Sequence, residues 1–156
     1  MAELPVFRMP SLPTSWVDAE GVEIPFGQRW GLAAPPDEAY ERITCPERYQ
    51  PLHDVADALL AHLLDEYECV AEEVPAAAHE LRAVRLLATG RSHGIGIAWT
   101  DFPGVRADLG GEVDAAAPIC GCDACDESLE QAAEQLSDSV LRAVAPGDAD
   151  WPLRAR

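Results

Sequence analysis

The sequence predicts an α+β fold, an antiparallel β-meander of about four strands flanked by an N-terminal and a C-terminal long helix. Apolar residues recur at helical spacing before residue 75 and again after residue 128. Between these stretches, short segments alternate bulky with small or polar residues, as strands do. The links between those segments contain Gly or Pro and are too short for the crossovers of a parallel sheet.

The 156 residues suffice for one domain with a buried core. Residues 1–36 are rich in proline, which excludes a long helix, and they contain Trp16 and Trp30. We therefore expect a Pro-rich arm that packs on the domain. Residues 37–146 are predicted to form a single α+β domain. Residues 147–156 are a tail from which Trp151 folds back.

The first long helix is expected over residues 51–73, after a short helix that begins near Pro36. Pro75 ends it. Its buried stripe comprises Leu52, Val55, Ala56, Leu59, Leu63, Tyr67 and Val70.

The strands are expected at residues 80–89, 94–102, 105–109 and 113–119, with both long helices on one face of the sheet. The final helix should run to Val144. It can begin at Asp123, with acids in its first turn, or at Ser128, whose spacing from Gln131 fits a capping box. Its buried stripe comprises Leu129, Ala132, Ala133, Leu136, Val140 and Val144.

The chain is strongly acidic, with 28 Asp and Glu against 11 basic residues and a net charge of −17. Every basic residue is arginine, which excludes a Schiff-base lysine and a P-loop. Such a charge repels nucleic acid and anionic membranes, so neither is an expected partner. It fits a basic protein partner, or it serves solubility alone.

The expected compartment is the cytoplasm. No segment approaches 18 continuous apolar residues, and residues 1–16 lack the layout of a signal peptide. In that reducing compartment, five cysteines argue against a disulfide framework.

Three of the cysteines, Cys120, Cys122 and Cys125, fall within six residues at a predicted strand-to-helix junction. One interpretation is a structural zinc site, because thiolates on a tight turn can supply several ligands and nearby acids favour a cation. A second is thiol redox chemistry at Cys122 and Cys125, because a helix N-terminus lowers a thiol pKa. In the third, the cysteines are small buried residues without chemistry.

Three segments together resemble a bacterial family known only as a domain of unknown function. They are residues 38–49, 99–104 (Trp-Thr-Asp-Phe-Pro-Gly) and 120–127 (Cys-Gly-Cys-Asp-Ala-Cys-Asp-Glu). The last is the most specific, and the resemblance covers roughly residues 36–144. It implies that the cysteine loop is a family feature and assigns no activity.

Zinc bound by three cysteines needs a fourth ligand. In an up-and-down meander, residue 119 leaves the sheet at the end where residue 80 enters it. A helix reaching residue 73 would end nearby, so we expect Cys69 first, and His79 second, to complete the site. Cys45 and His93 are expected to take no part.

These patterns favour a non-enzymatic binding or accessory module whose cysteine loop is stapled by zinc. The alternative is an enzyme that uses the same loop, either by thiol redox chemistry or with a catalytic zinc. A catalytic zinc keeps an open position, whereas a structural zinc is closed by four protein ligands.

Overall fold

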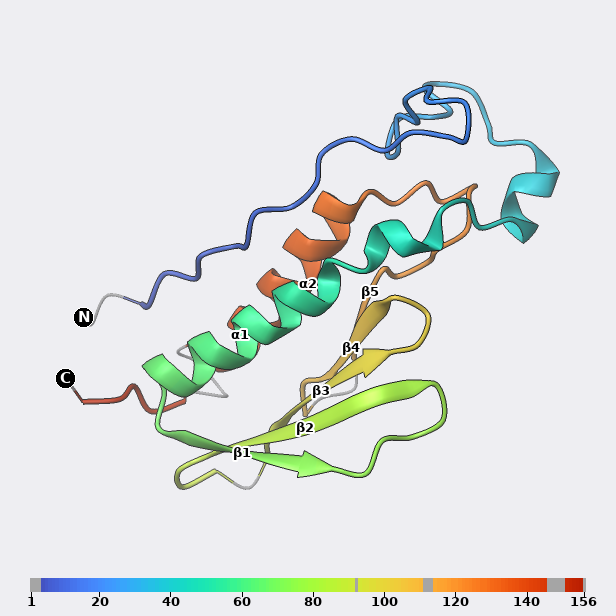
Figure 1. Cartoon of the computed structure of the whole chain (residues 1–156). Helices are drawn as coiled ribbons and strands as arrows, with labels where there is room; N and C mark the ends of the chain where they lie inside the picture. The colour runs from blue at the N-terminus through green and yellow to red at the C-terminus, as the bar shows by residue number, and fades with distance from the viewer. Residues whose placement is uncertain (1–3, 92, 111–113, 146–150, 156) are drawn as a thin grey trace.

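A computed structural model describes residues 4–91, 93–110, 114–145 and 151–155. Two helices lie on one face of a five-stranded antiparallel sheet (Figure 1). In chain order the elements are η1 (Asp37–Glu41), η2 (Pro46–Tyr49), α1 (Leu52–Glu66), β1 (Cys69–Val74), β2 (Glu80–Ala88), β3 (Ile95–Thr100), β4 (Gly104–Asp108), β5 (Ala115–Ala117) and α2 (Leu129–Val144).

The predicted antiparallel meander is confirmed, with the strands in the order β1-β2-β3-β4-β5. Val84 pairs with Ile97, Trp99 with Val105, and Val105 with Ala117, so the strands reverse direction in turn. No helix occurs in the described residues between 80 and 118. The predicted start of the last strand at Val113 lies outside the described residues.

The sequence-based prediction missed β1 and made the first helix too long. Helix α1 ends at Glu66, and Tyr67 is already extended, with φ −118° and ψ 150°. Residues 69–74 instead pair with β2 as an edge strand, from Cys69 opposite Ala88 to Val74 opposite Ala83. A short apolar run fits the period of a helix as well as that of a strand, and hydrogen bonding to β2 makes residues 69–74 a strand.

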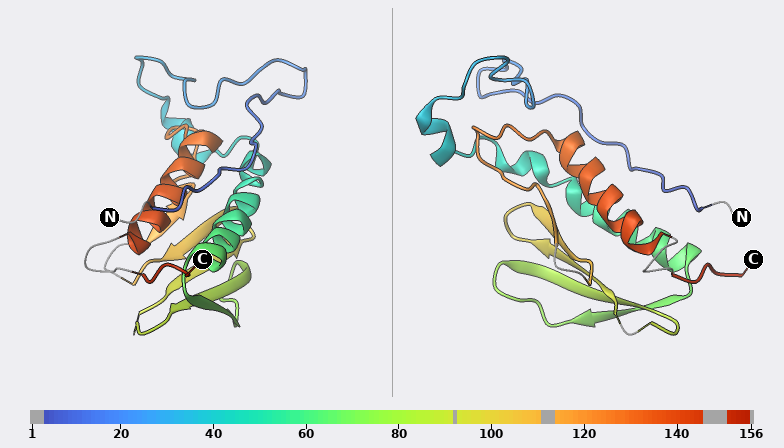
Figure 2. Two further views of the ribbon diagram at one scale, coloured as in Figure 1. Left: turned by 90° about the vertical axis from the view of Figure 1, so that its left-hand side faces the viewer. Right: turned by 180° about the vertical axis from the view of Figure 1, so that it is seen from behind.

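The core lies between the helices and the sheet. The predicted stripes of α1, up to Leu63, and of α2 are buried. They pack on the alternate strand residues Val84, Leu86, Ile95, Ile97, Trp99 and Val105. Arg85, between Val84 and Leu86, and Arg106, after Val105, are exposed on the other face. Figure 2 shows both helices and the N-terminal segment on the same side of the sheet.

The N-terminal segment has no helix among residues 4–36, and its only bridge joins Val17 to Glu23. Phe7, Leu12 and Trp16 pack against the core. Trp151 is buried with its ring against Tyr67, so the chain folds back as expected. The predicted helix stop at Pro146 and Gly147 lies outside the described residues.

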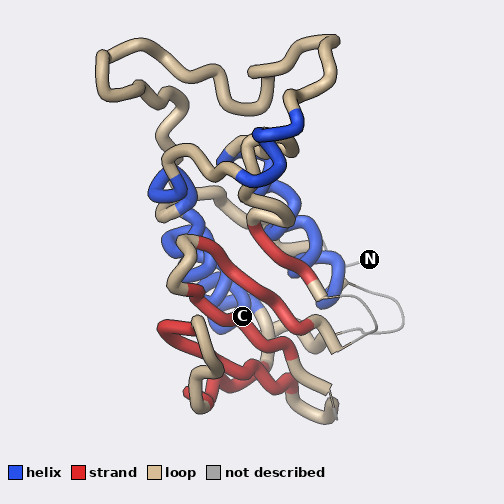
Figure 3. The backbone as a smooth tube through the Cα atoms, turned by 90° about the vertical axis from the view of Figure 1, so that its right-hand side faces the viewer, coloured by secondary structure: helices blue, strands red, loops and turns tan. Residues whose placement is uncertain are grey.

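Loops gather at one end of the molecule. The later part of the N-terminal segment, η1, η2 and residues 118–128 lie together beyond the strands (Figure 3), whereas the first part of that segment runs alongside the helices (Figure 1). Among the described helices, none has the length and apolar content needed to cross a bilayer.

Candidate metal centre

The candidate site is the loop of residues 118–128, which joins β5 to α2. Ser128 ends the loop as the N-cap of α2. Its side chain accepts a hydrogen bond from the Gln131 backbone at 3.1 Å, and the Gln131 side chain accepts one from the Ser128 backbone at 3.0 Å. This capping box decides between the two predicted starts in favour of Ser128. Residues 118–127 are therefore irregular and held by other contacts.

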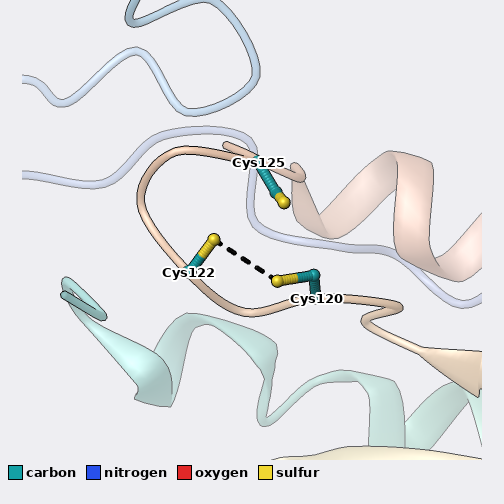
Figure 4. A group of neighbouring side chains, drawn as sticks. All are labelled: Cys120, Cys122 and Cys125. Atoms are coloured by element: carbon teal, nitrogen blue, oxygen red, sulfur yellow. Dashed lines mark hydrogen bonds between the residues drawn. The ribbon is translucent and has the colours of Figure 1, made fainter. Parts of the chain in front are cut away.

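The three thiols of the loop face one another (Figure 4). The Sγ atoms of Cys120 and Cys122 are 3.3 Å apart, and all three Sγ atoms lie within 4.8 Å of one another. Cys120 and Cys122 are half-buried, whereas Cys125 is exposed. The loop thus presents three soft ligands at a surface.

The flanking carboxylates of Asp123 and Asp126 hold the loop rather than face the thiols. Asp123 is buried and accepts hydrogen bonds from the backbone and hydroxyl of Thr44 at 2.7 and 2.6 Å. Asp126 is buried and accepts from the Arg29 backbone at 2.8 Å, and its carboxylate pairs with the Arg29 guanidinium. The expectation that these acids favour a cation at the cysteines therefore needs correction.

Glu127 lies near the end of the loop and holds the start of the loop in place. Its Oε2 accepts hydrogen bonds from the backbones of Ile119 at 2.9 Å and Cys120 at 3.2 Å. Its carbonyl oxygen accepts from Arg48 at 2.9 Å and from the Tyr49 hydroxyl at 2.6 Å. Burial raises the pKa of the Glu127 carboxyl, because solvent no longer stabilises the charge.

Arg48 is the buried cation that supports Glu127. It is completely buried, and its guanidinium lies 3.7 Å from the Phe26 ring centroid and 4.2 Å from that of Tyr49. Burial raises the pKa of Tyr49 to about 12, so its hydroxyl stays protonated and can donate to Glu127. A buried cation must be paired or hydrogen-bonded, and here the aromatic faces and the Glu127 carbonyl serve that purpose.

The three segments that carry the family resemblance meet at this loop. The backbone amide of Asp123 donates to the Arg42 carbonyl, and that of Ala124 donates to the Ala39 carbonyl. From the segment at 99–104, the Phe102 ring packs on Gly121, where an added Cβ would lie 2.7 Å from the ring. The three segments are far apart in sequence, and together they form the cysteine loop and its immediate contacts.

Residues of the N-terminal segment also build the loop, and of these only Trp30 was expected to pack on the domain. Arg29 pairs with Asp123 and Asp126, and the Trp30 indole donates to the Asp123 carbonyl at 2.8 Å. The sequence signal was the aromatic residues among the prolines, which indicated packing but not its location.

The thiols differ in acidity. A hydrogen bond from the Cys125 backbone lowers the pKa of the Cys122 thiol. Hydrogen bonds to Cys120 and Cys122 raise the pKa of Cys125 to about 12. In the absence of metal, negative charge is therefore favoured at Cys122, with Cys125 as a donor.

Cys69 does not join the cluster, and its predicted role as fourth ligand is corrected. Because α1 ends early, Cys69 starts β1 opposite Ala88, at the end of β2 remote from the loop. The nine residues of β2 separate these ends by about 26 Å. The buried Cys69 thiol donates instead to the Leu63 carbonyl at 3.4 Å.

The second predicted ligand, His79, also lies outside the cluster. It directly precedes β2, at the end of the sheet where the cysteine loop lies, but its ring pairs with Asp101 at 3.0 Å. Cys45 and His93 are likewise outside the group. Within the described residues, no fourth Cys, His, Asp or Glu joins the three thiols.

The fold and the loop define an α+β protein with a three-cysteine cluster at a strand-to-helix junction. A family model described as a family of unknown function, DUF6226, matches residues 13–151. Because the match spans most of the chain, the protein belongs to this family. No curated protein and no solved structure matches the chain.

Proposed function

We propose that the protein is a zinc-binding accessory module in which Cys120, Cys122 and Cys125 hold one zinc ion. The observation that carries the proposal is the approach of three thiols within 4.8 Å in a loop whose Asp123 and Asp126 carboxylates are engaged by Thr44 and Arg29. Thiolates are soft ligands, and among abundant divalent ions they suit zinc.

The sulfur spacing fits such an ion. Zinc–sulfur bonds of about 2.3 Å in a tetrahedron place the sulfurs about 3.8 Å apart. The observed spacing runs from 3.3 Å for Cys120 and Cys122 to at most 4.8 Å across the group, so this value lies within the range. Small rotations of the three cysteine side chains suffice to bring the sulfurs to this spacing. The backbone need not move, and the Asp123, Asp126 and Glu127 contacts hold it in place.

The fourth position has no ligand among the described residues. A donor from a partner protein closes the tetrahedron, as a structural zinc requires, and the exposure of Cys125 leaves room for that donor. In the isolated chain, water takes this position. Three thiolates and one zinc carry a net charge of −1, which adds to the acidity of the chain. We assign the module to the cytoplasm, in a non-enzymatic role beside a basic protein partner.

Metal analysis of the purified chain tests the proposal. We expect about one zinc per chain and less than half of that in Cys125→Ser, since two thiolates bind weakly. Cobalt in place of zinc should give thiolate-to-metal charge-transfer absorption that Cys125→Ser removes. Cys45→Ser is the matched control. Metal content equal in the two variants would contradict the assignment.

Thiol–disulfide exchange is the second candidate, supported by the 3.3 Å approach of Cys120 and Cys122 and the lowered pKa of Cys122. The Cys122 thiolate would attack a partner disulfide, forming a mixed disulfide and releasing one partner thiolate. Cys120 would then attack the Cys122 sulfur, forming an intramolecular disulfide and releasing the second partner thiolate.

The two candidates differ in their dependence on Cys125. Zinc binding needs all three thiols, whereas exchange needs only Cys120 and Cys122. Disulfide reductase activity retained in Cys125→Ser, in a chain that purifies without metal, would favour exchange.

A further inference from the structure

The face of the sheet that the helices leave uncovered has a hollow of about 540 Å³. Its floor is formed by Ala83 on β2 with Gly96 and Ala98 on β3. Ala83 and Ala98 are only 8% and 9% exposed, although no described helix covers this face. Neighbouring side chains therefore stand above the floor as walls. A hollow of this volume is in the range of small-molecule sites.

Two arginines form opposite walls. Arg85 pairs with Gly96 across β2 and β3, and Arg106 pairs with Ala98 across β3 and β4, so both side chains project on the floor's side. Neither makes a side-chain hydrogen bond or ion pair with any described residue, although Glu72 lies opposite Arg85 on β1. In a chain of net charge −17, two unpaired guanidinium groups beside one hollow indicate an anionic ligand.

The wall on β4 carries an acid as well as Arg106. Asp108 lies in the same row as Gly96 and Arg85, two strands and about 9.6 Å from Arg85. One oxygen of Asp108 accepts from the Gly110 backbone at 3.0 Å, and no side chain or backbone amide among the described residues donates to the second. Glu80 and Asp114 also line the rim, and Glu80 is engaged by the Ala77 backbone. A purely anionic ligand would meet repulsion on this side.

We propose that this hollow binds a small zwitterion with two carboxylates and one ammonium group, the chemistry of an acidic amino acid. The carboxylates pair with Arg85 and Arg106, and the ammonium pairs with Asp108 across Gly96. Gly96 leaves room for the body of the ligand because no side chain rises from it. The site lies on the sheet face opposite the helices and involves no cysteine.

L-Glutamate is the probe, with glutarate as the matched compound that lacks the ammonium group. In NMR titrations of the full chain, L-glutamate should shift the amide signals of residues 83–85, 96–98 and 106–108 saturably. Glutarate should bind at least about tenfold more weakly, because it has no ammonium group to pair with Asp108. The Asp108 carboxylate then lies unpaired near a carboxylate of the ligand.

Variants separate the parts of the site. Arg85→Gln and Arg106→Gln should each weaken L-glutamate about tenfold or more. Arg142→Gln, an exposed change on α2 with the same loss of charge, should have no effect. Asp108→Asn retains an oxygen for Gly110 and should reduce the preference for L-glutamate over glutarate to near unity.

Gly96→Val fills the floor and should abolish the amide shifts. A Cβ at Gly96 meets only Asp108 Cβ, at 3.4 Å, and valine favours strands, so the variant should fold. Cys125→Ser should bind L-glutamate like the wild type, which separates this site from the zinc proposal. The absence of saturable shifts with L-glutamate at millimolar concentration would overturn the inference, as would shifts that persist in the Arg85→Gln, Arg106→Gln double variant.

Discussion

Asp123 contributes more hydrogen bonds to the cysteine loop than its thiols do. Its carboxylate bonds to Thr44 and its carbonyl to Trp30 and Arg29, which ties residues 29–30 and 44 to the loop. Burial alone would raise the pKa of this carboxyl, but the Thr44 hydrogen bonds and the Arg29 charge together hold it below its ordinary value. The charged form is therefore the one the folded state requires.

Asp123→Asn should lower the free energy of unfolding at pH 7 by about 2 kcal/mol, because it removes one of the two carboxylates that pair with Arg29 and weakens the hydrogen bonds from Thr44. A carboxyl with a depressed folded pKa stabilises the fold above its unfolded pKa of about 3.9, and that stability is lost as pH falls through the folded pKa. Urea titrations at pH 7 and pH 3 check this.

The wild type and Asp123→Asn should converge in stability as the pH falls below about 4. Asp138→Asn, an exposed change on α2, is the control and should follow the wild type at both pH values. A constant difference between the wild type and Asp123→Asn across this range would argue against the charged role of Asp123.

At the scale of elements, the end of α1 decides which cysteines can meet. The stripes of both helices and four strands follow from periodicity, which depends on local sequence. Residues 69–74 have no such unique pattern, because Val70 and Val74 suit a helix or an edge strand, and only pairing with β2 selects the strand. The fourth-ligand prediction was wrong for this reason.

Cys69→Ser should keep the zinc content of the wild type while lowering the thermal midpoint, because a buried thiol is replaced by a more polar hydroxyl. The expected cost is about 1–2 kcal/mol. Metal analysis and calorimetry of the same preparation measure both quantities. Loss of zinc in Cys69→Ser would support Cys69 as the fourth ligand and contradict the observed position of β1.

At the scale of the whole molecule, the sequence indicated the cysteine cluster but not its support. Cys120, Cys122 and Cys125 are close in sequence, so their proximity was predictable. The contacts of Arg29, Trp30 and Arg48 with residues 123–127 span roughly 80 to 100 positions of the chain, and no local pattern encodes them. These contacts become visible only when the proline-rich segment and the cysteine loop are both placed in three dimensions.

The net charge of −17 predicts salt-sensitive association with cationic surfaces. An arginine-rich peptide should bind at low ionic strength and weaken at least tenfold on going to physiological salt, as measured by fluorescence anisotropy. Duplex DNA should show no binding under the same conditions. Tight DNA binding in moderate salt would contradict the proposed partner class.

Buried carboxylates and arginines shape the loop, and we propose that its thiols thereby remain available for zinc. The most direct measurement is the thermal midpoint of the reduced chain after chelation and again after zinc is restored. The chelated chain should remain folded, because the Asp123 and Glu127 contacts need no metal, and zinc should raise its midpoint in proportion to binding. A midpoint that zinc leaves unchanged would contradict the claim.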